Sequence, residues 1–170
     1  MKQQQTRDMV YQSAEQSFGI IPPLIKEIAE VSVPVAALYV DGVTTMNASA
    51  FSEIEINAIE LRISSLNGCE SCIRGHSYLS RKAGLSEADV KAITEGRLTS
   101  IDSLNRIIRG TDAIFYASRS GYAGHLNFWE KEQFSRKEIF EIIGLLSLKT
   151  ISNNINNYLK AVMAPQTIPG

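Results

Sequence analysis

Residues 60–76 read ELRISSLNGCESCIRGH and hold both cysteines of the chain, Cys69 and Cys72. An apolar helical pattern ends at Asn67-Gly68, so the two cysteines straddle the first turn of the next helix. In that turn, unpaired backbone N–H groups and the helix dipole lower the pKa of a thiol. Two cysteines separated by two residues at a helix start can also close a disulfide with little backbone movement. This segment therefore predicts a reactive dithiol.

Polar side chains beside the dithiol suggest a route for protons. His76 lies four residues after Cys72, one helical turn away on the same face, where an imidazole can take a proton from a thiol or give one to a leaving oxygen. Four polar residues at helical spacing form one stripe along the preceding helix: Asn57, Glu60, Ser64 and Asn67. The stripe faces either water or the thiol pocket. In the second case Glu60 exchanges protons with the dithiol, directly or through water.

Helical patterns and helix-breaking residues account for the rest of the chain. Capping boxes begin two helices, at Ser52 and at Ser135. The alternation over residues 53–56 would also suit a strand, but the length of the apolar pattern favours a helix. The sequence predicts one all-α domain over residues 1–170, with a mobile tail over residues 165–170. Helices are expected over residues 4–17, 24–43 with a kink or break at Pro34, 53–66, 69–83, 86–96, 102–120 and 135–161, with a single helical turn over 125–132.

The composition is that of a soluble globular protein, with 44% apolar and 21% charged residues. The formal net charge of −1 provides no broad field to attract nucleic acid or anionic lipid. Charged or polar residues interrupt each apolar stretch before the roughly 20 residues that cross a bilayer, and the N-terminal residues lack the apolar segment of a signal peptide. We therefore expect a cytoplasmic protein without nucleic-acid or membrane partners. In such a reducing compartment a cysteine pair is more often reactive or metal-binding than structural.

A structural zinc site is the other common use of paired cysteines. Such a site takes about four protein ligands. The segment supplies at most three, Cys69, Cys72 and His76, and the chain has one further histidine, His125. Zinc binding and a buried, inert cysteine pair remain alternatives to redox chemistry. We expect no metal and no flavin or nucleotide cofactor, since the sequence contains no glycine-rich phosphate loop.

Two groups of residues carry a resemblance to a known family: Leu61-x-Ile63-Ser64 and Asn67-Gly68-Cys69-x-x-Cys72-x-x-x-His76. They resemble the core motif of the alkylhydroperoxidase D / carboxymuconolactone decarboxylase superfamily, over roughly residues 50–95. Peroxidase members of this superfamily are all-α homo-oligomers, commonly trimers or hexamers, that reduce hydroperoxides with the cysteine pair. The resemblance implies an antioxidant, peroxiredoxin-type activity in this chain.

The resemblance also implies a role for each site residue. Cys72 would be the attacking thiol, Cys69 the resolving thiol, and His76 part of the proton relay. Peroxidase members carry a glutamate where this chain has Asn57 and a histidine where it has Ser71. Glu60, one turn along from the first of these positions, could replace the missing glutamate.

The main hypothesis is thus a thiol-dependent hydroperoxide reductase or disulfide oxidoreductase. An external dithiol, of the thioredoxin or lipoyl type, would restore the reduced pair. One alternative is a catalytically quiet oligomeric protein of the same fold that binds partners or senses redox state. Another is a lactone decarboxylase, although that branch of the superfamily typically lacks this dithiol.

The last expected helix carries the prediction about assembly. Its apolar residues lie nearly all round it, and a helix that is apolar on all sides needs neighbours on all sides. In a chain of this length a subunit partner can supply them, so we expect a homo-oligomer with the dithiol pocket near the interface. Further along this helix, four asparagines predict a solvated or interface face, with contact to the dithiol pocket as the alternative: Asn153, Asn154, Asn156 and Asn157.

Overall fold

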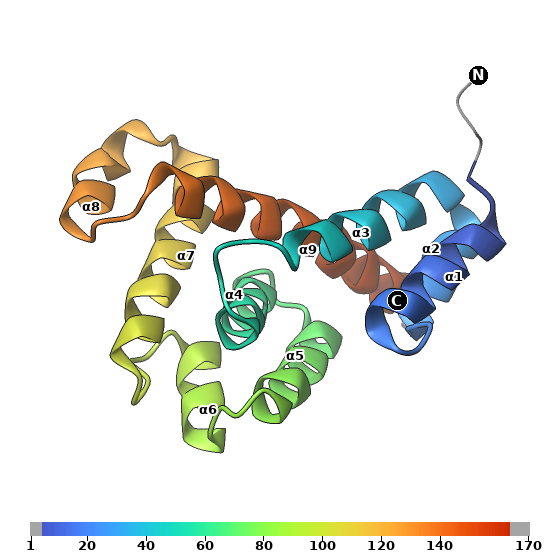
Figure 1. Cartoon of the computed structure of the whole chain (residues 1–170), viewed down its shortest axis with the longest axis horizontal. Coiled ribbons are helices and arrows are strands. Elements are labelled where there is room, and N and C mark those ends of the chain that lie inside the picture. The colour runs from blue at the N-terminus through green and yellow to red at the C-terminus, as the bar shows by residue number, and fades with distance from the viewer. Residues whose placement is uncertain (1–4, 164–170) are drawn as a thin grey trace, which may run out of the picture. The chain divides into compact units, whose positions relative to one another are not determined.

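A computed structural model describes residues 5–163, and each regular element in that range is a helix (Figure 1). The described residues divide into two compact units, one up to Ser49 and the other from Ala50. That these units form a single domain over residues 1–170 stays a prediction, and the expected mobile tail lies outside the described residues. The helices are α1 (Arg7–Phe18), α2 (Pro23–Val31) and α3 (Val33–Met46) in the first unit, and α4 (Glu53–Leu66), α5 (Glu70–Lys82), α6 (Glu87–Glu95), α7 (Asp102–Ser120), α8 (Leu126–Lys131) and α9 (Arg136–Met163) in the second.

Capping residues and prolines set the helix boundaries of the first unit. The Thr6 side chain accepts a hydrogen bond at the start of α1, and Gly19 ends that helix with a left-handed φ of 72°. The predicted break before Pro34 is confirmed, because α2 and α3 are separated at Ser32. Pro34 lies in the first turn of α3, where a missing N–H costs no helical hydrogen bond.

In the second unit α4 begins with the predicted capping box. The backbone N–H of Glu55 donates to Ser52 Oγ, and the backbone N–H of Ser52 donates to the Glu55 carboxylate at 2.8 Å. The strand that the alternating pattern would also suit is therefore absent at this place. The boundary matters for the site, because it fixes which residues α4 presents to each of its neighbours.

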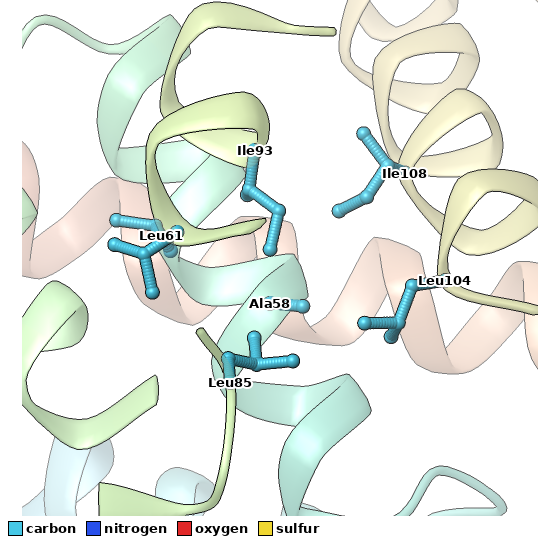
Figure 2. Packing of buried hydrophobic residues seen from close by; sticks show 7 residues of the cluster. Ala58, Leu61, Leu85, Ile93, Leu104 and Ile108 are labelled. Atoms are coloured by element: carbon cyan, nitrogen blue, oxygen red, sulfur yellow. The ribbon is translucent and has the colours of Figure 1, made fainter. Parts of the chain in front are cut away.

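Helix α4 lies among α5, α6, α7 and α9 and contacts each of them (Figure 1). On one side a hydrophobic cluster joins it to α6, α7 and the segment before α6, and Figure 2 shows these side chains converging. Burying each leucine or isoleucine side chain in such a cluster stabilises the fold by about 1.5–3 kcal/mol relative to leaving it exposed. The cluster consists of Ala58, Leu61, Leu85, Val90, Ile93, Leu104 and Ile108. Because α4 has protein on nearly every side, its polar stripe does not face solvent.

An arginine on α4 fixes α6 and α7 against it. The guanidinium of Arg62 binds both carboxylate oxygens of Asp112 on α7, at 2.6 and 3.1 Å. It also donates to the carbonyl oxygens of Ile93 and Thr94 at the end of α6. These bonds lie at the C-terminal end of α6, where the Ile93 carbonyl also accepts from the Gly96 N–H at 3.2 Å. Arg62 thus pairs with an acidic residue and serves the packing of the bundle.

The last helix differs from its predicted character. Its start is confirmed by the second capping box, in which Ser135 and Glu138 exchange hydrogen bonds. Its buried side is apolar only in the first half, at Ile142, Leu145 and Leu146, and becomes polar in the second half, at Lys149, Ser152 and Asn153. The sequence analysis expected a helix that is apolar on nearly all sides and did not predict the change from apolar to polar residues along the buried side. The polar half of the buried side packs against α4 and α5, where the dithiol lies.

Candidate active site

The two cysteines occupy the start of α5, as predicted. Cys69 is the N-cap residue, and its backbone N–H donates to the Ser64 carbonyl at the end of α4. Gly68 makes the turn between the helices with a left-handed φ of 63°. Cys69 and Cys72 form a disulfide. Cys69 is fully buried and Cys72 is 8% exposed, so Cys72 is the slightly more exposed of the two residues.

Glu60 and His76 meet one helical turn along α5 from Cys72, together with a third charged residue. A Glu60 carboxylate oxygen lies 3.3 Å from His76 Nδ1. On the other side of the ring, Lys149 Nζ on α9 lies 2.6 Å from His76 Nε2, and it is 3.9 Å from the second Glu60 oxygen. The exposed fractions of the three side chains are 12% for Glu60, 12% for His76 and 4% for Lys149. Three helices thus contribute one group each to a nearly dry cluster.

The surroundings of His76 keep its ring neutral. Burial lowers the pKa of the imidazole, the Lys149 charge lowers it further, and the Glu60 charge opposes both, with a resulting pKa of about 4. A neutral ring accepts a hydrogen bond at one nitrogen and carries its proton on the other. Because the Lys149 ammonium donates to Nε2, the ring proton belongs on Nδ1, facing the Glu60 carboxylate. That contact is electrostatic, since its geometry is not that of a hydrogen bond.

Asparagines of α9 hold the turn that delivers the dithiol. The side chain of Asn153 is fully buried, accepts from Asn67 at 2.9 Å and donates to Ser64 Oγ at 3.4 Å. Asn157 donates to the Asn67 carbonyl at 3.1 Å. The prediction of a solvated or interface face is therefore wrong for Asn153 and Asn157. Two asparagine side chains instead satisfy polar groups at the end of α4, where an unpaired buried group would be costly.

Helix α9 runs antiparallel to α5 along the site. Three pairs of side chains join the two helices, and residue numbers rise on α5 as they fall on α9. The pairs are Glu70 with Lys160 at 2.8 Å, Cys72 with Asn156 at 3.2 Å, and His76 with Lys149 at 2.6 Å. This register brings α9 donors to both the disulfide and the histidine.

Not every residue of the predicted stripe reaches the cluster. Asn57, at the position of the glutamate in peroxidase members, donates to the Glu53 carbonyl of its own helix. Ser71 lies 3.5 Å from Cys69 Sγ. Sequence reasoning missed Lys149 and Asn156. The available signal was a lone lysine within the apolar run of the last helix, followed at helical spacing by asparagines.

Two further features of the described chain bear on function. Within residues 5–163, no group of three or more histidine, cysteine or acidic side chains is arranged to hold a metal ion. Over the same range, no helix combines enough length and apolar character to span a membrane.

Fold and site together define an all-α dithiol protein with a buried Glu–His–Lys cluster. Residues 34–100 match the carboxymuconolactone decarboxylase family. A solved structure from Agrobacterium tumefaciens, of a protein of unknown function suggested to be the antioxidant defence protein AhpD, has a similar fold with a TM-score of 0.63 and 20% identity. The alignment covers 83% of this chain and 96% of that one. No curated protein matches this sequence. As its motif predicted, the comparisons support a likeness to the alkylhydroperoxidase D / carboxymuconolactone decarboxylase superfamily: the family match covers residues 34–100, and the solved structure shares the fold.

The low pKa of His76 predicts a loss of stability in mild acid. This pKa is about 4 in the folded chain against 6.5 for an unperturbed histidine, so between these values the unfolded state binds the extra proton. The free energy of unfolding should therefore fall as the pH drops from 6.5 towards 4, by at most about 3 kcal/mol. Urea unfolding at a series of pH values measures this change.

A His76→Gln variant serves as the control for this titration. Glutamine keeps a polar side chain without a charge change, so the slope of stability against pH should flatten above about pH 5, where carboxylates contribute little. An unchanged slope in the variant would show that other groups cause the acid sensitivity.

Proposed function

We propose that the protein is a thiol-dependent peroxidase that reduces hydroperoxides with the Cys69–Cys72 pair. The observation that carries the proposal is the disulfide at the start of the helix that also holds His76, one turn further along, in a buried cluster with Glu60 and Lys149. The superfamily includes both peroxidases and decarboxylases, and a dithiol able to cycle between thiol and disulfide has a direct use in the first reaction. The family match over residues 34–100 supports this assignment.

In the proposed reaction, Cys72 loses its proton to become a thiolate and attacks the O–O bond of the hydroperoxide. The bond between sulfur and the terminal oxygen forms as the O–O bond breaks, giving a sulfenic acid on Cys72 and an alkoxide. The alkoxide takes up one proton and leaves as an alcohol. The Cys69 thiol then displaces the sulfenic oxygen, so that a disulfide forms and water leaves. An external dithiol reduces the disulfide by exchange, through a mixed disulfide.

The buried cluster suits the proton steps of this reaction. His76 is neutral at pH 7, and it lies one helical turn from Cys72. Between the carboxylate of Glu60 and the ammonium of Lys149, the ring can pass a proton without leaving net charge in a nearly dry site. We propose that this cluster stores the proton lost by Cys72 and returns it to the alkoxide.

Thiol titration tests the proposal directly. The fully reduced protein should lose two thiols on addition of one equivalent of an alkyl hydroperoxide, with release of one equivalent of alcohol. With excess peroxide and a small dithiol, the protein should consume many equivalents. Loss of two thiols without turnover would identify a redox sensor instead, and retention of both thiols would exclude peroxide chemistry at this site.

We further propose that the protein is a homo-oligomer, a trimer or a hexamer. The superfamily resemblance implies such assemblies, and large apolar side chains of the second unit are exposed, including Phe140 at 65% and Tyr158 at 66%. Burial of these side chains between subunits would stabilise the assembly. Light scattering at micromolar concentration should give a mass of three or six subunits. A stable 18.8 kDa species across a dilution series would contradict this.

A further inference from the structure

The side-chain amide of Asn156 donates a hydrogen bond to the sulfur of Cys72. The distance from Nδ2 to Sγ is 3.2 Å. Within the described part of the chain, this is the one hydrogen bond to either sulfur that comes from outside α5. The sulfur of Cys69 instead has the Ser71 hydroxyl at 3.5 Å, from the same helix turn. The two sulfurs therefore have different polar surroundings.

The neighbours of Asn156 on α9 hold this amide in place. Asn153 and Asn157 bind the end of α4, one helical turn before and one residue after it. Lys149 and Lys160 bind His76 and Glu70 on α5, on either side along the helix. The amide can therefore stay at the sulfur without paying much additional side-chain entropy.

An amide donor has a larger effect on the reduced protein than on the oxidised one. A disulfide sulfur is a weak acceptor, whereas a thiolate carries a full negative charge, and hydrogen bonds to charged groups are the stronger ones. A donor placed at one sulfur lowers the pKa of that thiol relative to its neighbour. The helix start by itself favours a thiolate at Cys69, the N-cap residue, so a separate donor is needed to favour Cys72.

We propose that Asn156 is a catalytic residue that stabilises the thiolate of Cys72 and so selects Cys72, rather than Cys69, as the nucleophile. This inference rests on the proposed function for its role in turnover, but the ionisation of Cys72 can be measured without any peroxide. It also agrees with exposure, since Cys72 is the more exposed of the two residues.

The test uses proteins that retain a single thiol. In a Cys69→Ser background, the rate of alkylation of Cys72 by iodoacetamide is measured against pH to give the thiol pKa. Adding Asn156→Leu, which keeps the shape of the side chain and removes the donor, should lower the acid ionisation constant of Cys72 by about tenfold or more. The matched control is Asn154→Leu, on the exposed side of the same helix, which should leave the constant unchanged.

The outcomes separate this inference from the proposed function. An unchanged Cys72 pKa in a folded Asn156→Leu variant would overturn the inference, even if the wild-type protein reduces peroxides. A raised pKa in a protein that reduces no peroxide would support the inference and overturn the proposed function. If Asn156→Leu does not fold, the Cys69→Ser and Cys72→Ser proteins still decide: the pKa of Cys72 should be the lower of the two, and an equal or higher value overturns the selection.

Discussion

Replacing Cys72 with serine is expected to abolish hydroperoxide reduction. A serine hydroxyl does not ionise near neutral pH and cannot attack an O–O bond as a thiolate does. In the Cys69→Ser variant the first step should survive, so that one equivalent of peroxide is consumed and a sulfenic acid remains on Cys72. Peroxide consumption, together with trapping of the sulfenic acid by dimedone and peptide mapping, measures both effects.

The pair of variants also tests the order of the two thiols. Each replaces one sulfur by one oxygen at a helix start, so each serves as the structural control for the other. A dimedone adduct on Cys69 in the Cys72→Ser variant, with no adduct on Cys72 in the Cys69→Ser variant, would reverse the assignment. Full peroxidase turnover in either variant would remove the disulfide from the mechanism.

Removing either proton-transfer group near the dithiol should slow peroxide reduction by about 10²–10⁴-fold. Glu60→Gln removes the carboxylate charge at nearly constant volume, and His76→Ala removes the ring between Glu60 and Lys149. Without either group, the proton released by Cys72 has no buried store from which to return to the alkoxide. The value of kcat/KM for an alkyl hydroperoxide, with circular dichroism to verify folding, measures the effect.

A glutamate on the surface of the same helix supplies the matched control. Glu53 lies in the first turn of α4 and is exposed, so Glu53→Gln should leave kcat/KM near the wild-type value. Wild-type kinetics in both Glu60→Gln and His76→Ala would exclude these residues from proton transfer. A loss of activity in which the variants also unfold at lower urea concentration would assign them a structural role.

The boundaries of the fold could be predicted because they depend on short stretches of chain. The capping boxes at Ser52 and Ser135 involve residues three positions apart. The break before Pro34 depends on the proline ring alone, which removes a backbone N–H and clashes with the preceding helical turn. The helical turn expected over residues 125–132 is present as α8, but the 3₁₀ turn that precedes it at Ala123–His125 was not predicted. Helix ends without a side-chain cap give the sequence no such local marker.

The candidate site could be predicted on α4 and α5 but not on α9. The dithiol, His76 and Glu60 lie within 17 residues, where helical spacing fixes which side chains share a face. Lys149 and Asn156 are separated from His76 and Cys72 by 73 and 84 positions. The α9 residues that lie opposite His76 and Cys72 depend on the axial shift and rotation of α9 relative to α5. The packing of the whole bundle sets both. For this reason the sequence pattern alone favoured a solvated or interface face for the α9 asparagines.

The antiparallel register of α5 and α9 has a consequence for the growing chain on the ribosome. Translation supplies α4, both cysteines and His76 long before it supplies Lys149, Asn153 and Asn156. A nascent chain that ends after α8 therefore has two thiols at a helix start but none of the α9 donors. The hydrogen bond from Asn156 that distinguishes Cys72 from Cys69 can form only after this part of α9 has left the exit tunnel. The order of synthesis therefore places the α9 donors well after the two thiols, and the complete site can form only when both segments are available.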